Sequence, residues 1–426
     1  MFTITIINPS VMTHAKRSTV RLFLLCLMTG GGIRADGFRN PPAGAAALGR
    51  IGGRIAYTED ASTITHNPAN LVDLTEPSLL SSLTFGYNKM TFEGPAGTAS
   101  SQSPWAVLPN VYATRPIREE GRWAFGIGLN SPYGRSTELE EDTIFRFSAP
   151  YYTQLLSVEL LPTFATRLND RLAFGFSVNL LWSELDIRQS YPWALASQTP
   201  GLPDGKTKFQ ADGAGIGATL ALTWKVAENQ RWAVSYRSPI KVEYEGDLDV
   251  TQIPEGAPAA ARSDFETEIT FPMVVAVAYG IQITDRLLLE TNVEWARQSS
   301  FDQLELDAGV NTALLPSNVI ETDWGDNWTY GISAAWKLNQ DWQLRTGYVY
   351  LESPVPSRTM LPTTAEQSQG VWSIGAGYFQ GAHRLDFAYS LGLFSGRRVD
   401  DNENPLFNGK YDFEAHLVSL SYGYHF

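Results

Sequence analysis

Cysteine is almost absent from this sequence, and the one that occurs is expected to be removed. The chain of 426 residues contains one cysteine, Cys26, which falls in the apolar part of an expected export signal. Leu25 excludes lipid attachment at Cys26, because lipoprotein processing needs a small residue before the cysteine. The exported chain would then carry no cysteine, which excludes disulfide bonds and thiolate metal sites.

Long apolar runs and an excess of basic residues are also missing. No run is long enough for a membrane-spanning helix, which needs about 20 predominantly apolar residues. The chain has 32 Lys+Arg against 45 Asp+Glu, a formal net charge of -13. Binding to phosphates needs a basic surface, so we expect no nucleic-acid partner.

Neither a catalytic motif nor a metal-ligand pattern occurs. The glycine clusters do not follow a phosphate-binding pattern, and there is no G-x-S-x-G sequence. The histidines that follow the expected export signal are not spaced as metal ligands; they are His66, His383, His416 and His425. We therefore expect no enzyme activity, no cofactor and no metal site.

Residues 1–35 are predicted to be an export signal. Lys16, Arg17 and Arg21 form a basic region, and a short apolar region covers Leu22–Met28. Ala35 is the expected last residue before cleavage. Both Met1 and Met12 are candidate start sites, and the sequence does not choose between them.

After residue 78 the chain alternates between large apolar residues and small or polar ones. In the last segment Leu420, Tyr422 and Tyr424 alternate with Ser419, Ser421 and Gly423. Such segments of about ten residues match the length of a tilted strand that crosses a bilayer (about 9–11 residues). A soluble β-sandwich also alternates. Aromatic residues at the ends of the apolar faces, opposite Gly, Ser and Thr, favour a membrane barrel.

The connections between these segments alternate between short and long. Six short turns and seven long loops require fourteen strands, with both chain ends on the short-turn side, as in bacterial outer-membrane barrels. The expected short turns are residues 117–122, 167–171, 226–231, 283–286, 337–341 and 380–383, and the expected long loops are residues 88–104, 131–150, 189–212, 248–266, 307–323, 352–369 and 395–411. The predicted fold is all-β: a transmembrane antiparallel barrel of about 14 strands over residues 79–426.

The stretch before the barrel is unlike the rest. Residues 36–71 are rich in Gly and Ala, poor in large apolar side chains, and patterned neither as an amphipathic helix nor as a strand. Such a segment cannot build a core of its own. We therefore predict that residues 36–78 form a plug inside the barrel.

The chain resembles the FadL/TodX family of outer-membrane channels for long-chain fatty acids and aromatic hydrocarbons. The plug region resembles the N-terminal hatch of that family, and the resemblance covers nearly the whole exported chain. The matching pieces are Asp36–Phe38, Ala45–Gly49, Tyr57–Ser62, Asn67-Pro68-Ala69, Trp123–Gly126, Tyr236-Arg237-Ser238 with Lys241 and Gly246-Asp247, and Ser353–Pro356.

The resemblance implies roles for particular residues. Asn67, Pro68 and Ala69 would fix the plug against the wall through backbone hydrogen bonds, or else form a turn with no further role. Phe38 would reach a ligand pocket, or else belong to a disordered terminus. The third strand would be kinked to give a lateral exit. Alternation stops there at Ser131–Gly134, where Pro132 removes a ladder donor and Gly134 permits a bulge.

Other residues are candidates for contact with a ligand. Arg188, at the outer end of the fifth strand, would pair with a ligand carboxylate. Trp193, Leu195 and Leu202 are unusually apolar for an exposed loop and would line a capture groove, although packing between loops explains them equally well.

Two carboxylates of one strand and an acidic residue of a loop also bear on the ligand and the plug. Glu290 and Glu294 fall on the lumen phase of the ninth strand, where they would contact plug arginines such as Arg50 or Arg54 or face water. Near Glu305 some fatty-acid channels have a basic residue, so an acidic residue there leaves uncharged hydrocarbons open as ligands.

The function that these observations favour is passive uptake of hydrophobic small molecules across the outer membrane of a bacterium. The ligand would be a long-chain fatty acid or an aromatic or aliphatic hydrocarbon, handed from a loop groove to a lumen pocket. The alternative is a structural or adhesive barrel with a permanently closed plug. We expect a monomer that contacts outer-membrane lipid and lipopolysaccharide and is recognised by the barrel-assembly machinery through Phe426.

Overall fold

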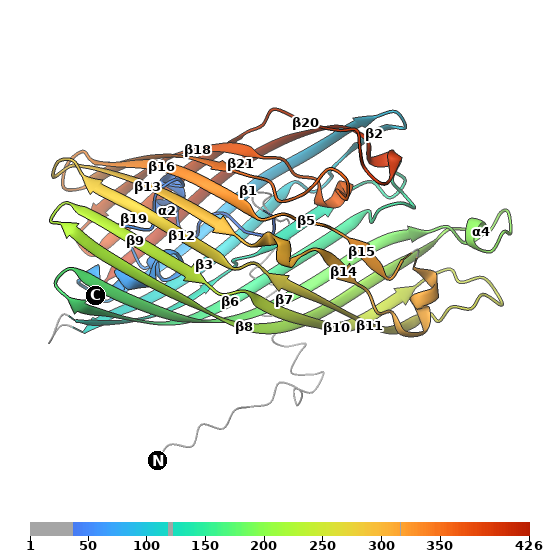
Figure 1. The fold of residues 1–426 in the computed structure, drawn as a ribbon, viewed down its shortest axis with the longest axis horizontal. Helices are drawn as coiled ribbons and strands as arrows, with labels where there is room; N and C mark the ends of the chain where they lie inside the picture. The colour runs from blue at the N-terminus through green and yellow to red at the C-terminus, as the bar shows by residue number, and fades with distance from the viewer. Residues whose placement is uncertain (1–36, 118–121, 316) are drawn as a thin grey trace, which may run out of the picture.

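The computed structural model describes residues 37–117, 122–315 and 317–426. The predicted export signal therefore lies outside the described residues. Fourteen antiparallel strands form one closed barrel (Figure 1), which confirms the predicted fold class and strand number. No helix in the described part of the chain is long and apolar enough to cross a bilayer.

Each barrel strand pairs with its neighbours in chain order, and three of the fourteen are interrupted. The strands are β1 (Ser78–Gly94), β3 (Trp105–Ile117), β4 (Trp123–Asn130) with β5 (Gly134–Glu138), β6 (Tyr152–Asn169), β7 (Leu172–Tyr191), β8 (Gly205–Ala227), β9 (Gln230–Arg237) with β10 (Ile240–Val250), β11 (Arg262–Phe271) with β12 (Val274–Gln282), β13 (Leu287–Ala296), β16 (Asn327–Lys337), β17 (Trp342–Leu351), β18 (Gln369–Gln380), β19 (His383–Leu393) and β21 (Gly409–His425).

The remaining elements are short. The plug contains α2 (Ala45–Gly49), α3 (Thr63–His66) and the 3-10 helix η2 (Pro68–Asp73). The loops contain β2 (Gly97–Ser100), α4 (Trp193–Ala196), η3 (Gln298–Ser300), β14 (Gln303–Glu305), η4 (Gly309–Leu314), β15 (Val319–Glu321), η5 (Pro362–Thr364), β20 (Arg397–Val399) and η6 (Pro405–Phe407).

The barrel closes between its first and last strands. Leu83 of β1 lies opposite Leu420 of β21 on one side and opposite Pro109 of β3 on the other. Closure satisfies the backbone N–H and C=O groups of both strands, which a bilayer cannot do because it offers no hydrogen-bonding partners.

The outer face of the wall is apolar and the inner face is small or polar. In β21, Leu420 and Tyr422 are 51% and 45% exposed, whereas Ser419 and Ser421 are buried inside. Exposed tryptophans near the short turns, among them Trp224, Trp336 and Trp342, follow the girdle pattern of outer-membrane barrels.

The plug lies inside the barrel near the end that carries the short turns, where it is drawn in blue in Figure 1. Glycines of the wall allow its backbone to approach closely. A Cβ on Gly175 of β7 would lie 2.2 Å from the amide nitrogen of Ala69, and one on Gly331 of β16 would lie 2.4 Å from the carbonyl oxygen of Gly52. Small residues on both surfaces therefore let backbone pack on backbone.

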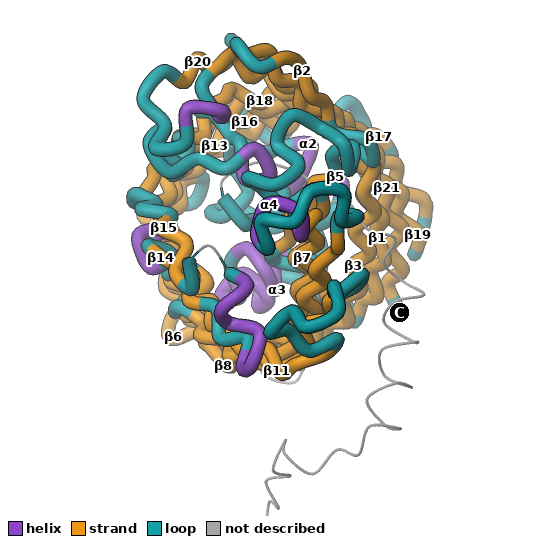
Figure 2. The backbone as a smooth tube through the Cα atoms, turned by 90° about the vertical axis from the view of Figure 1, so that its right-hand side faces the viewer, coloured by secondary structure: helices purple, strands orange, loops and turns teal. Residues whose placement is uncertain are grey.

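Several strands extend into segments that the sequence predicted to be long loops. β7 runs to Tyr191 and β8 starts at Gly205, so the connection is much shorter than the predicted 189–212. Beyond the bilayer the outward-facing residues become polar, as at Lys206 and Lys208. The apolar alternation therefore stops in the sequence, although β7 and β8 remain paired. Figure 2 shows how the loops at this end fold over the barrel mouth.

We predict that Gly175→Ala destabilises the plug–wall contact by about 1–3 kcal/mol, because the new methyl group has no room against the Ala69 backbone. The measurement is the unfolding midpoint of the detergent-solubilised protein together with protease cleavage of the plug. Gly325→Ala is the matched control, since its Cβ would lie 4.0 Å from the nearest atom. Equal stability of the two variants would contradict the prediction.

Candidate functional site

The wall of the barrel has a break in its third strand. β4 ends at Asn130, and β5 starts at Gly134 and pairs with β6. In the described residues, the part of β3 from Trp105 to Asn110 pairs with β1 on one side, and β5 forms no ladder with its other side. We call this region, from Ser131 to Gly134, the strand gap.

The N-terminal segment of the plug crosses the strand gap. The amide of Asn40 donates to the carbonyl of Pro132 at 2.9 Å, and the amide of Gly134 donates to the carbonyl of Phe38 at 2.9 Å. The segment from Phe38 to Asn40 thus gives the interrupted strand the backbone partners that it loses there. Gly134 does not have a positive φ. Its lack of a side chain instead makes room for the side chain of Asn40. A Cβ added at Gly134 would lie 3.0 Å from Asn40 Nδ2.

Phe38 anchors this segment in a group of aromatic rings. Its ring centroid lies 4.6 Å from that of Trp324 and 4.8 Å from that of Phe301, and Tyr133 of the strand gap stacks on Phe271 at 4.3 Å. We call Phe38, Tyr133, Phe271, Phe301 and Trp324 the aromatic cluster. It belongs to a larger buried apolar group beneath the loops. Phe38 is 5% exposed and is therefore buried in this structure.

A cavity of about 130 Å³ lies directly beside the strand gap, between plug and wall. Its lining combines Pro132 and Tyr133 with charged side chains from both surfaces, including Arg54, Arg237 and Glu294. Arg237 of β9 donates to the hydroxyl of Tyr133 at 3.0 Å and forms an ion pair with Glu159 of β6. The strand gap is therefore tied through Arg237 to β9 of the wall.

The two carboxylates of β13 do contact plug arginines, as predicted. Glu294 pairs with Arg54 at 2.8 Å and with Arg39 at 2.5 Å. Glu290 accepts the backbone amides of Ile55, Ala56 and Tyr57, and Arg50 lies 3.8 Å away. Each carboxylate therefore holds the plug to the wall.

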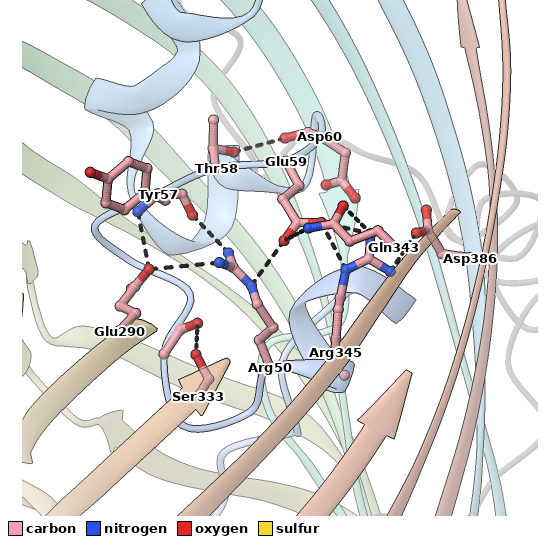
Figure 3. Close-up of polar contacts among 12 residues, drawn as sticks. Arg50, Tyr57, Thr58, Glu59, Asp60, Glu290, Ser333, Gln343, Arg345 and Asp386 are labelled. Atoms are coloured by element: carbon pink, nitrogen blue, oxygen red, sulfur yellow. Dashed lines mark hydrogen bonds and ion pairs between the residues drawn. The ribbon is translucent and has the colours of Figure 1, made fainter. Parts of the chain in front are cut away.

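Glu59 of the plug is the centre of a second group of charges (Figure 3). Its carboxylate lies 2.6 Å from Arg345 and 3.1 Å from Arg50, and Arg345 also pairs with Asp386 at 2.9 Å. Burial alone would raise the pKa of Glu59, but the guanidinium groups of Arg345, Arg50 and Arg384 outweigh burial and lower this pKa to about 2. The carboxylate is thus held in its charged form.

The Asn67-Pro68-Ala69 triplet contacts the wall differently from the prediction. The side-chain amide of Asn67, rather than its backbone, donates to Thr223 of β8 at 2.9 Å. Its Oδ1 accepts the amide of Ala69 at 3.0 Å, which caps η2. The backbone of Pro68 and Ala69 lies against Gly175.

The loop residues predicted to meet a ligand do not come together in one site. Trp193 of α4 is buried and donates to the carbonyl of Thr251 at 3.2 Å, whereas Leu195 is 75% exposed. Leu202 packs against the apolar group beneath the loops. A role in ligand capture stays a prediction for all three.

Arg188 already has an acidic partner. It pairs with Asp186 through two hydrogen bonds of 2.9 and 2.8 Å, and its guanidinium lies 4.4 Å from the ring centre of Tyr152. In the alternation along β7, Arg188 falls on the same face of the strand as Leu180, which points outward. A ligand carboxylate would have to compete with Asp186, and the proposed carboxylate role of Arg188 stays a prediction.

Sequence reasoning missed most of the charged residues of the lumen. Arg345 and Asp386 stand on the small-residue phase of their strands, opposite the lipid-facing residues Leu344 and Leu385. A charged residue at a lumen-facing position of a strand indicates a contact inside the barrel, and this signal would have identified both residues. Glu366, in a loop, had no such signal. Glu305, which the sequence singled out, lies exposed in β14 of a loop.

The comparisons with known proteins agree with this geometry. A family model described as "Outer membrane protein transport protein (OMPP1/FadL/TodX)" matches residues 27–426. This chain belongs to that family. Its location is therefore the outer membrane, and the family's members are transport channels rather than enzymes.

Known relatives are distant but cover nearly the whole chain. The long-chain fatty acid transport protein of Salmonella typhi is 23% identical over 420 residues, covering 92% of this chain and 93% of that protein. Outer membrane protein P1 of Haemophilus influenzae is 21% identical over 427 residues, covering 88% and 90%.

Solved structures share the fold. A Pseudomonas aeruginosa FadL homologue has a TM-score of 0.80 at 20% identity and covers 92% of this chain and 100% of that one. The toluene transporter TodX of P. putida has a TM-score of 0.69 at 19% identity and covers 91% and 99%. At these identities the likeness extends to the fold alone.

We predict that acid loosens the plug around Glu59. Because its folded pKa of about 2 lies below the ordinary 4.5, the ionised carboxylate contributes about 3 kcal/mol, present in full above pH 4.5 and lost as the pH falls towards 2. Hydrogen exchange of residues 55–62, corrected for intrinsic rates, should rise over this range. In Glu59→Gln the same segment should exchange faster at every pH with a flatter profile. Unchanged protection of the native segment down to about pH 2.5 would disprove the assignment.

Proposed function

We propose that this protein is a passive channel that takes hydrophobic small molecules, long-chain fatty acids or hydrocarbons, across the outer membrane. The observation that carries the proposal is the strand gap, which only the segment Phe38–Asn40 bridges by backbone hydrogen bonds within the described residues. A single short segment thus separates the buried aromatic cluster from a break in a wall that faces the bilayer.

The physical reason for such a route lies in the solubility of the cargo. An apolar molecule gains about 25 cal/mol for each Å² of its surface that leaves water, so it crosses by passing between apolar surfaces. Exposed Leu195 would offer such a surface at the mouth, and the buried apolar group against which Leu202 packs, with its aromatic cluster, would offer the next one. Release of Phe38 from the cluster would vacate a ligand-sized place beside the strand gap.

The exit that fits this arrangement is lateral. Without the segment Phe38–Asn40, the strand gap would join the lumen to the hydrocarbon layer, and the cargo would never re-enter water. Movement of the whole plug is a more costly route, because Glu59, Glu290 and Glu294 hold it to the wall through buried charges.

The charges around the aromatic cluster favour uncharged cargo. Arg237 is paired with Glu159, and Arg135 of β5 is paired with Glu366. A hydrocarbon leaves both pairs intact, whereas a fatty-acid carboxylate would draw on a cation that already has a partner. Hydrocarbons are therefore our first choice of ligand and fatty acids the second.

A barrel with a permanently closed plug is the second candidate function. It is favoured by the anchoring of the plug's C-terminal end, where Asp73 pairs with both Arg167 of β6 and Arg231 of β9. In that case the protein would act as a structural or adhesive component of the envelope, and locking the strand gap would change nothing.

The proposal includes the assembly of the protein in the envelope. Residues 1–35 would direct export, and residues 36–78 and 79–426 would fold as plug and barrel. Phe426 is 71% exposed at the end of the last strand, where the barrel-assembly machinery would recognise it. The mature protein would act as a monomer surrounded by outer-membrane lipid and lipopolysaccharide.

We predict that a disulfide across the strand gap abolishes uptake. Asn40→Cys with Gly134→Cys should form this bond when oxidised, because the Cγ of Asn40 lies 3.6 Å from the Cβ position of Gly134. The native chain offers no competing cysteine after Cys26. The measurement is uptake of radiolabelled toluene and oleate by cells, before and after reduction.

Reduction should restore uptake, and each single-cysteine variant should transport under both conditions. Full uptake by the oxidised double variant would contradict a route through the strand gap. It would leave a route through the periplasmic mouth.

We further predict that Arg188→Ala weakens binding of oleate by about tenfold and leaves toluene binding unchanged, since a charge-assisted hydrogen bond contributes about 1.5–3 kcal/mol. Fluorescence titration with a labelled fatty acid and competition by toluene measure both. Equal loss for the two ligands would contradict a carboxylate-binding role for Arg188.

A further inference from the structure

Arg135 and Glu366 form a buried ion pair beside the strand gap. Arg135 follows Gly134 at the start of β5, and Glu366 lies in the loop between η5 and β18. Arg135 Nη1 is 3.0 Å from Glu366 Oε2, and each side chain is 4% exposed. The pair connects two segments that are more than two hundred residues apart in sequence.

The Arg135–Glu366 pair binds both backbone polar groups of Gly37, its N–H and its C=O. Gly37 directly precedes Phe38. The carboxylate oxygens of Glu366 both lie 3.2 Å from the amide of Gly37, and Arg135 Nη1 donates to the carbonyl of Gly37 at 3.2 Å. Gly37 has a φ of 69°, and a Cβ there would lie 2.6 Å from Gln298. The segment that carries Phe38 is therefore held at Gly37 by this ion pair, at a position with no room for a side chain.

The same guanidinium also holds the extracellular loop. Arg135 Nη2 donates to the carbonyl of Ala365 at 3.0 Å and its Nε to the carbonyl of Thr363 at 3.4 Å. Thr137, two residues along β5, donates to the same Thr363 carbonyl at 2.8 Å. Loop residues 363–366 and the N-terminal segment therefore share one side chain as their common support.

The whole connection between β17 and β18, which contains residues 363–366, faces the buried apolar group into which a ligand would move. Val355, Met360 and Ala365 are buried in that group, and Leu361 packs against it. A molecule that enters the group from the mouth must displace these side chains, and with them the carbonyls that Arg135 binds.

We propose that Arg135 and Glu366 are a latch that couples this loop to the segment Phe38–Asn40. Displacement of the loop by an arriving apolar ligand withdraws Glu366 from Gly37, and Phe38 then leaves the aromatic cluster. Arg135 and Glu366 are positioning residues: they touch the gating segment and not the cargo. The inference rests on the proposed function, because it assigns a trigger to the opening of the strand gap.

The test uses the full-length protein with Asn40→Cys as the reporter in the strand gap. Glu366→Gln keeps the shape of the side chain and removes its charge. We expect the rate at which a maleimide labels the reporter thiol in proteoliposomes to rise by about tenfold or more, since hydrogen bonds to charged groups contribute at least that factor. Arg135→Lys keeps the charge but cannot hold both loop carbonyls, and should give a smaller rise.

Controls separate a latch from general loosening. A second reporter, Thr58→Cys on the other side of the plug, should be labelled at the same rate with and without Glu366→Gln. Glu403→Gln removes an exposed ion pair with Arg358 in the loops and should leave labelling at position 40 unchanged. Equal rises at positions 40 and 58 would mean that Glu366 only stabilises the barrel, and would overturn the latch.

The latch and the proposed function fail in different ways. If the oxidised double-cysteine variant (Asn40→Cys with Gly134→Cys) still takes up toluene, the route through the strand gap is wrong. If oxidation stops uptake but Glu366→Gln and Arg135→Lys leave labelling at position 40 at its original rate, the route stands and the latch is wrong. If both variants fail to fold, labelling of the Asn40→Cys reporter alone decides: a rate that toluene does not raise overturns the coupling.

Discussion

The structure depends on the satisfaction of backbone hydrogen bonds in a medium that supplies none. A bilayer offers no partner to an exposed N–H or C=O group, so a spanning sheet must close on itself. The pairing of β1 with β21 achieves this closure. Where β4 stops at Asn130, the same requirement reappears inside the wall, and the segment Phe38–Asn40 meets it with its own backbone. This segment of the plug thus also takes part in the sheet.

A break that is bridged by a short segment of the plug can open when that segment moves away. A break that is closed by a neighbouring strand can open only if the barrel itself comes apart. The segment is short and is held by two backbone bonds, the side chain of Asn40, the ring of Phe38, the ion pair at Gly37 and the ion pair between Arg39 and Glu294. The rest of the plug is held by many groups. Glu59, Glu290 and Asp73 each bind several partners there, and Glu294 pairs with Arg54 as well as with Arg39 of the segment. For this reason the proposed movement is assigned to the N-terminal segment of the plug.

The buried charges have a second consequence. An ion pair inside a protein is costly to separate, because the partner left behind stays desolvated and unpaired. Lumen arginines such as Arg237, Arg345 and Arg135 are therefore already paired with carboxylates of the protein before any ligand arrives. An apolar cargo can pass such groups without disturbing them. This is why the proposed function gives uncharged molecules preference over charged ones.

The sequence alone determined the barrel, its fourteen strands and the inner position of the plug, because side chains in a spanning strand must alternate and a Gly- and Ala-rich segment cannot form its own core. It also located the strand gap at Pro132 and placed Glu290 and Glu294 towards the plug, since both follow from phase along one strand. Only the tertiary structure decided that Phe38–Asn40 fills the gap, that Asn67 binds through its side chain, and that Arg135 meets Glu366. These contacts join segments far apart in the chain, and no local periodicity encodes which distant residue will face which.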